Sequence, residues 1–268
     1  MDGTDQIPET IAGLQVSARR LRGRTGSGRF GDFCDVITLP AGRIGVLVGQ
    51  VLSQQASGGM ALARSVLRAT ANIESRPSQV LASLNRALLS WSPQEQPWLS
   101  GIYATVRPTR LGIRVKASLA GDQAALVRRS DGGVISLGLP GSRLGARADP
   151  DLGDERCMLR SGDCLVLVTE SVPAALGPSG AERLRDLVAR LGSGSAARSV
   201  AAVLGAVGEQ CRGRVEHDVV ALAVKVPGNR RGTGLHASDW PGTRPYFRTY
   251  PALPLSGESP PIPDLPGR

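Results

Sequence analysis

The chain has 268 residues, of which 41% are hydrophobic and 21% are charged, and its net charge is +9. No apolar stretch approaches the roughly 20 residues of a membrane-spanning helix. The N-terminal segment 1–13 carries acids without a basic residue, which excludes a secretory signal. The cysteines are too scattered for a disulfide framework or a zinc knuckle: Cys34, Cys157, Cys164 and Cys211. We expect a cytoplasmic globular protein that does not associate with a membrane.

Arginine dominates the basic residues, since Lys116 and Lys225 are the only lysines. An excess of positive charge suits nucleic acid or an acidic partner. The arginines are, however, spread along the whole chain, and no motif of a nucleic-acid-binding module accompanies them. A GC-rich coding bias also explains arginine in place of lysine. Nucleic-acid binding is therefore only a minor hypothesis.

Composition divides the chain into three parts. Nine of the 19 prolines lie in residues 227–268, where neither helical nor strand periodicity is visible. This tail is either solvated or a docking peptide built around its aromatic residues: Trp240, Tyr246, Phe247 and Tyr250. We therefore expect an N-terminal extension at 1–10, one domain at 11–226 and a tail without regular structure at 227–268.

Hydrophobic periodicity predicts the elements of the domain in blocks. A β-rich run at 43–51 precedes helices at 59–71 and from Pro77 onward, where one face is apolar. Four strand-like segments follow, at 102–107, 111–118, 124–129 and 164–169, then helices at 181–191 and 196–210 and a final strand at 219–226. Paired helices between runs of antiparallel strands favour an α+β fold over a doubly wound parallel sheet.

Carboxylates gather at the predicted ends of strands. Asp32 and Asp35 lie just before the first hydrophobic run, Glu170 follows the strand at 164–169, and His217 and Asp218 precede the last strand. Converging carboxylates are how proteins bind hard divalent metals such as Mg²⁺. An acidic residue in such a position is more often a turn or helix-cap residue than a metal ligand. The order in which the segments occur is stronger evidence than any one of them.

That order resembles the metal-dependent serine/threonine protein phosphatase (PPM) family, in its bacterial SpoIIE-like, RsbU-like branch. The similar segments are FGDFCD at 30–35, GQVLS at 49–53, PSQVLASLNR at 77–86, GIYATV at 101–106, LRSGDCLVLVTE at 159–170 and EHDVVAL at 216–222. They follow the family order from about residue 11 to 226. The resemblance implies a β-sandwich of two antiparallel sheets flanked by helices, in α-β-β-α layers.

The resemblance also implies a chemistry. In the family, aspartates hold two Mn²⁺ or Mg²⁺ ions that activate a water molecule for attack on phosphoserine or phosphothreonine. Substrates in this branch are typically phosphorylated anti-anti-sigma proteins, in partner-switching control of transcription. The chain would thus act on, or bind, a phosphorylated or unphosphorylated regulatory protein of that kind, and homodimerisation stays open.

The sequence departs from the family pattern at its acidic positions. Gln50 replaces the aspartate after Gly49, and His217 falls on the first aspartate of the final pair. In the Thr-Asp-Gly motif, Glu170 replaces the aspartate and Ser171 replaces the glycine. A neutral amide cannot bridge two dications as a carboxylate does. The predicted metal site is therefore degenerate, with Gln50 at a lost aspartate position and these remaining candidates: Asp32, Asp35, Glu170, His217 and Asp218.

Three hypotheses follow from this pattern. The favoured one is a pseudophosphatase, a binding module in which catalysis is weak or lost because of Gln50, Glu170 and His217. The alternative is an active phosphatase that uses Mn²⁺ or Mg²⁺, and the lesser alternative is a basic nucleic-acid-binding protein. Asp32, Glu170 and His217 also form a set that suits one transition metal.

An arginine cluster precedes the first motif. Guanidinium groups are suited to bidentate recognition of phosphate. We therefore predict a phosphate-binding or partner-binding role, with a solvated basic edge strand as the plain alternative, for these residues: Arg19, Arg20, Arg22, Arg24 and Arg29.

Overall fold

A computed structural model of the chain describes residues 10–11, 13–24, 30–53, 56–91, 97–109 and 111–228. The strands are β1 (Thr10–Ile11), β2 (Leu14–Leu21), β3 (Phe30–Leu39), β4 (Arg43–Leu52), β5 (Trp98–Thr109), β6 (Gly112–Ala120), β7 (Ala124–Arg128), β8 (Val134–Ser136), β9 (Glu155–Leu159), β10 (Cys164–Val168) and β11 (Val219–Lys225). The helices are α1 (Ala56–Thr70), α2 (Pro77–Leu89), α3 (Ser171–Ala175), α4 (Gly180–Arg190) and α5 (Ala196–Gln210).

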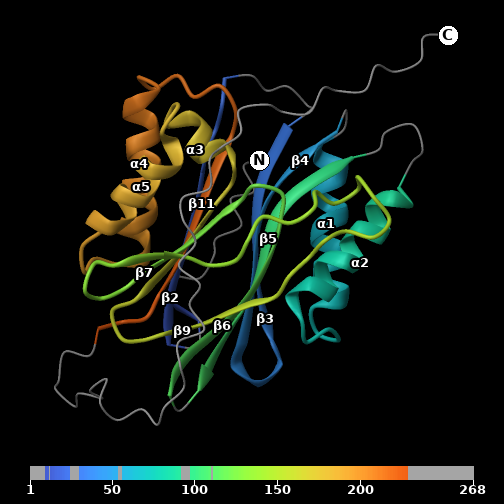
Figure 1. Cartoon of the computed structure of the whole chain (residues 1–268), viewed down its shortest axis with the longest axis horizontal. Helices are drawn as coiled ribbons and strands as arrows, with labels where there is room; N and C mark the ends of the chain where they lie inside the picture. Colours follow the sequence, from blue (N-terminus) through green and yellow to red (C-terminus); the bar gives the residue numbers. More distant parts are fainter. Residues whose placement is uncertain are drawn as a thin grey trace. The chain divides into compact units, whose positions relative to one another are not determined.

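These strands form two antiparallel sheets. One has the order β1-β2-β11-β10-β7-β8 and the other the order β3-β4-β5-β6-β9. Helices α3, α4 and α5 cover the outer face of the first sheet, and α1 and α2 cover that of the second (Figure 1). The α+β sandwich with outer helices is thus confirmed.

The hydrophobic residues form three layers of core. One cluster fills the space between the two sheets, and two others lie between each sheet and its helices. Successive side chains of a strand point to opposite faces, so that on β4 Ile44, Val46 and Val48 face the other sheet while Leu47 and Val51 face α1 and α2. The same alternation decides where each polar residue of these strands points.

Most predicted elements are present within a few residues of their expected ends. The clearest error concerns the segment with Asp32 and Asp35, which was expected to precede the first strand and instead lies inside β3. Its carboxylates interrupt the apolar alternation that predicts a strand. Helix α3 and strands β2, β8 and β9 were also missed, because they are short or carry polar residues.

Several predictions fall outside the described residues. These are most of the N-terminal extension, Arg29, and the tail from residue 229 with its aromatic residues. Within the described part of the chain, no helix is long and apolar enough to cross a bilayer.

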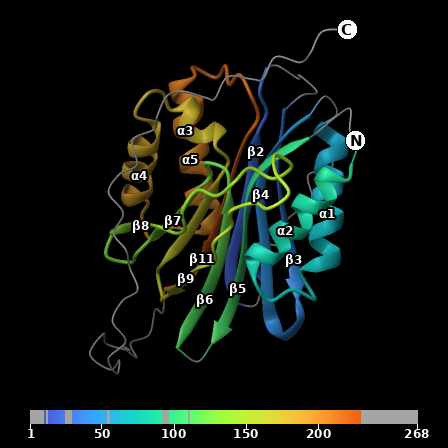
Figure 2. The ribbon, with the colours of Figure 1, turned by 45° about the vertical axis from the view of Figure 1, so that its right-hand side comes forward.

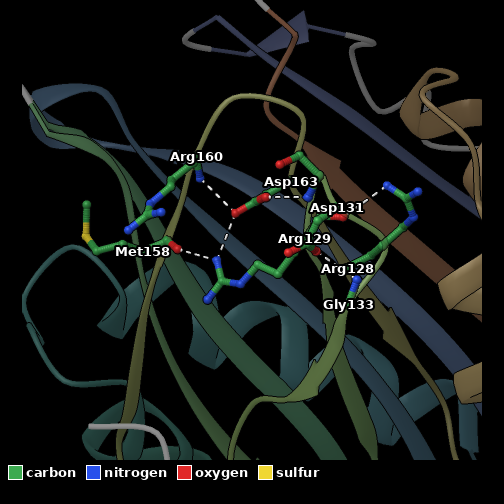
Figure 3. A network of polar contacts seen from close by, with 8 residues as sticks. Arg128, Arg129, Asp131, Gly133, Met158, Arg160 and Asp163 are labelled. Atoms are coloured by element: carbon green, nitrogen blue, oxygen red, sulfur yellow. Dashed lines mark hydrogen bonds and ion pairs between the residues drawn. The ribbon is translucent and has the colours of Figure 1, made fainter. Parts of the chain in front are cut away.

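The buried carboxylate of Asp163 lies in the turn between β9 and β10 (Figure 3). Asp163 is 1% exposed and accepts hydrogen bonds from the backbone N–H groups of Arg160 and Ser130, each at 2.9 Å. The Arg129 guanidinium donates to Asp163 Oδ2 at 2.8 Å and to the Met158 carbonyl at 2.7 Å. The Asp163 carbonyl in turn accepts from the N–H of Val226. The network ties β7, β9, β10 and the end of β11 together.

Candidate functional site

A row of three polar side chains crosses the five-stranded sheet on its inner face. Asp32 on β3 lies directly opposite Gln50 on β4, which lies opposite Ser100 on β5. All three are buried, with exposures of 0%, 9% and 6%. They alternate with residues that face the helices, so they point toward the other sheet, at the end of the apolar inter-sheet core.

Gln50 connects this row to the opposite sheet. Its Nε2 donates to Asp32 Oδ1 at 2.7 Å and to Ser171 Oγ at 2.6 Å. Ser171 begins α3, directly after the end of β10 in the other sheet. Because a carboxylate accepts hydrogen bonds, the amide must turn its NH₂ group toward Asp32. Two departures from the family motifs, Gln50 and Ser171, are therefore in direct contact with each other.

Asp32 is a buried acid with an incomplete set of donors. Its Oδ2 has no hydrogen-bond partner of good geometry among the described residues. Burial raises the pKa of Asp32 from 3.8 to about 6, although the side chains of Thr169, Gln50 and Ser171 lower it, and the charge of Asp218 raises it further. The carboxyl group therefore titrates close to neutral pH.

Glu170 lies on the β5 side of the site and faces a cation. Its Oε1 is 3.7 Å from Arg143 Nη2, while its Oε2 is buried without a partner among the described residues. Burial raises the pKa of Glu170, the Arg143 guanidinium and the Ser100 hydroxyl lower it, and the charge of Asp122 raises it. Arg143 Nη2 is also 3.9 Å from Asp122 Oδ2.

The loop that carries Arg143 is fixed by a buried side chain of α2. Asn85 is fully buried, its Nδ2 donates to the Arg147 carbonyl at 2.9 Å, and its Oδ1 accepts from the Gly145 N–H at 2.8 Å. Asn85 belongs to the Leu-Asn-Arg segment that resembles the family. Its role here is to position the loop that brings Arg143 to Glu170.

Asp218 lies on the β3 side, where its two oxygens face the end of β2 and the residues that follow it. Oδ1 accepts from the Gly23 N–H at 2.8 Å, and Oδ2 is 3.7 Å from Arg20 Nη1. A Cβ at Gly23 would lie 2.4 Å from the carbonyl carbon of His217, so only glycine permits this approach. Asp218 thereby orients a segment rich in arginine, and His217 is half-buried beside it.

Asp35 is not brought to the site. It lies three residues after Asp32 on β3 and so points to the opposite face, toward α1. There its Oδ1 accepts from Arg68 Nη2 at 2.9 Å and from the Val36 N–H. Of the predicted arginine cluster, Arg19 and Arg20 lie at the end of β2, where it pairs with β11, and Arg22 and Arg24 lie just beyond it; all four are exposed.

The site thus gathers Asp32, Glu170 and Asp218 around Gln50. Among the described residues, no three His, Cys, Asp or Glu side chains come close enough to hold a metal ion. Sequence reasoning missed four further members: Ser100, Arg143, Thr169 and Ser171. Ser171 was visible as a departure from the motif, whereas nothing in the sequence around Arg143 signals its contact with Glu170.

Comparison with known proteins identifies the family. The sequence model of stage II sporulation protein E (SpoIIE) matches residues 40–227. The structure is similar to that of the RsbU and RsbW domains of a Mycobacterium tuberculosis protein, with a TM-score of 0.64 and 18% identity; the match covers 82% of this chain and only 64% of that one.

Two phosphatase structures are also similar. The SpoIIE phosphatase domain of Bacillus subtilis has a TM-score of 0.57 and 14% identity, over 83% of this chain and 96% of that one. A serine/threonine phosphatase of S. agalactiae has a TM-score of 0.60 and 12% identity, over 80% and 99%. No curated protein matches the sequence significantly.

Proposed function

Because the chain belongs to the SpoIIE family of PPM-type phosphatases, we propose that it is a recognition module of bacterial partner switching in which hydrolysis is weak or lost. Its partner is a phosphorylated or unphosphorylated regulatory protein of the anti-anti-sigma kind. The similarity to a structure that contains RsbU and RsbW domains supports this setting, as does similarity to a structure described as part of the bacterial stressosome.

The observation that carries the proposal is the hydrogen-bonded bridge made by Gln50. Members of this family use Mn²⁺ or Mg²⁺, which need anionic oxygen ligands. Here the NH₂ group of Gln50 faces both Asp32 Oδ1 and Ser171 Oγ. An N–H donor repels a cation and occupies the lone pairs that the cation would use. The residues present therefore do not fit a two-metal centre.

The second flank of the site supports the same proposal. Arg143 stands 3.7 Å from Glu170, and its guanidinium supplies part of the positive charge that a dication supplies to a carboxylate. A metal ion at Glu170 would have to approach this guanidinium. Both carboxylates thus have a protein group beside them, an amide at Asp32 and a guanidinium at Glu170.

Recognition would fall to the predicted arginine cluster: Arg19, Arg20, Arg22 and Arg24 at and just beyond the end of β2, together with Arg29, which lies outside the described residues. Asp218, which in the family aligns with a metal-binding aspartate, here accepts from Gly23 and lies near Arg20. It thereby holds the backbone of Gly23, within the arginine-bearing segment, beside the start of β11. Guanidinium groups bind both carboxylates and phosphates, so the cluster suits either form of the partner.

The test is calorimetric titration of Mn²⁺ into metal-stripped protein, with hydrolysis of p-nitrophenyl phosphate measured on the same samples. We expect no binding of two ions and no turnover. Binding of about two ions per chain, with turnover that disappears in Asp32→Ala, would overturn the proposal and establish the alternative, an active metal-dependent phosphatase.

A further inference from the structure

The outer face of the five-stranded sheet carries four basic side chains in opposing pairs. Arg107 on β5 lies opposite Arg114 on β6, and Lys116 on β6 lies opposite Arg156 on β9. Their neighbours along each strand point into the inter-sheet core, which places all four on the outer face. The paired ends of β5 and β6 extend past α1 and α2 (Figure 2). We call these four residues the basic ladder.

Among the described residues, no acidic side chain forms an ion pair with the basic ladder. Arg107, Arg114 and Arg156 are exposed and Lys116 is half-buried. None of the ion pairs found in the described part of the chain involves any of them. Like charges directly opposite each other on neighbouring strands destabilise a sheet. An anion bound across these pairs would remove that repulsion.

The basic ladder is separate from the candidate site. Ser100 belongs to the site and lies near the beginning of β5, whereas Arg107 lies seven residues further along the same strand. At roughly 3.3 Å per residue, the distance along the strand is about 23 Å. The ladder also lies on the opposite face of the sheet, so its occupant would leave the site accessible.

We propose that the basic ladder is a second docking surface, which binds an acidic segment of a partner protein. Carboxylates match the donor geometry of guanidinium groups. Leu111, in the turn between β5 and β6, is 63% exposed and offers an apolar contact at the edge of the ladder, and protein interfaces commonly combine arginine with apolar contacts. Single-stranded nucleic acid would need exposed aromatic rings for base stacking, whereas Tyr103, the aromatic residue nearest the ladder along β5, is fully buried.

The test is the affinity of an oligoglutamate peptide, measured by fluorescence anisotropy at low salt. Arg107→Glu and Arg114→Glu each convert a like-charge cross-strand pair into an opposite-charge pair. We expect each variant to weaken peptide binding about tenfold or more and, in the same protein, to raise the melting temperature. Loss of binding together with a gain in stability separates the proposal from simple misfolding.

Arg198→Glu is the matched control. It makes the same reversal of charge in the exposed first turn of α5, where an acidic residue is favourable to the helix. We expect it to change the affinity by less than about twofold, within the effect of overall charge.

The proposal is overturned if Arg198→Glu weakens binding as much as the ladder variants do, or if the peptide does not bind. It is also overturned if oligouridine RNA or phosphatidylserine vesicles bind more tightly than the peptide in a ladder-dependent way. These readouts do not depend on metal binding or turnover, so this inference and the proposed function succeed or fail separately.

Discussion

Two buried aspartates, one at each end of β10, differ in how completely their charges are satisfied. Asp163, before the strand, accepts hydrogen bonds from two backbone N–H groups and a guanidinium (Figure 3). Asp32, near the residues that follow β10, accepts a hydrogen bond from Gln50 at Oδ1. Its Oδ2 has no hydrogen-bond partner of good geometry among the described residues. Exposure is 1% at the first and 0% at the second, so burial does not distinguish them.

The difference indicates what each aspartate does for the protein. A buried carboxylate with all its donors present stabilises the fold, and removing it leaves its partners unsatisfied. A buried carboxylate with a missing donor costs stability, as the raised pKa of Asp32 records. Such a cost is typical of functional sites. The comparison supports our proposal that the function lies at the Asp32 end of the sandwich, whereas Asp163 stabilises the fold at the other end.

The largest expected effect is the loss of stability when the Asp163 carboxylate is removed. Asp163→Ala removes the anionic acceptor shared by two backbone N–H groups and the partly buried Arg129 guanidinium, which keeps its hydrogen bond to the Met158 carbonyl. We expect a loss of about 3–5 kcal/mol in the free energy of unfolding. Urea denaturation measures it. Asp131→Ala, in the neighbouring exposed turn, is the control and should cost far less. A loss below about 1 kcal/mol for Asp163→Ala would contradict the structural role.

The next largest effect is a gain in stability, expected when Asp32 is replaced. The folded-state pKa of Asp32, about 6, lies above its ordinary value of 3.8, so proton uptake stabilises the fold. That contribution is complete below pH 3.8 and is lost as the pH rises through about 6. Asp32→Asn imitates the protonated acid, and we expect it to be more stable than the wild type by about 1–3 kcal/mol above pH 7 and equal to it near pH 4.

Urea denaturation across this pH range gives the comparison. Asp35→Asn on the same strand is the control, because it loses the ion pair to Arg68 and should be destabilised above pH 7. A stability difference between Asp32→Asn and the wild type that does not change with pH would show that Asp32 does not titrate in this range.

A third substitution tests whether Gln50 alone prevents metal binding. Gln50→Asp places a second carboxylate beside Asp32, so we expect a lower melting temperature in a chelator and a rise of several degrees on addition of Mn²⁺ at about 100 times its dissociation constant. Gln79→Asp, on the exposed face of α2, is the control. If Mn²⁺ has no effect on Gln50→Asp, the other departures, Glu170 with Arg143 and His217, also exclude the ion.

The smallest effect concerns Arg143. Its guanidinium lowers the pKa of Glu170, so Arg143→Met should raise that pKa further, whereas Asp122→Asn should lower it. NMR titration of the Glu170 carboxyl carbon measures both shifts. The stability change of Arg143→Met at neutral pH should stay below about 1 kcal/mol, because this ion pair is loose and partly exposed. Unchanged titration of Glu170 in both variants would exclude the contact.

The sequence by itself determined the family, the layered α+β architecture and most helices. Apolar periodicity is a local property of each segment, and the order of the motifs can be read along the chain. It also singled out Asp32 and Gln50, since both lie within motifs. It could not assign Asp35 to the outer face, because that requires the extent and register of β3. Asp32 and Asp35 interrupt the apolar alternation from which this strand could have been predicted.

Only the tertiary structure decided which partners these residues meet. Gln50 and Ser171 are 121 positions apart in the sequence. Arg143 reaches Glu170 from a loop that Asn85 anchors, and the opposing arginines of β5 and β6 depend on strand register. Contacts between distant segments follow from how the sheets pack and pair, and no pattern within one segment specifies them.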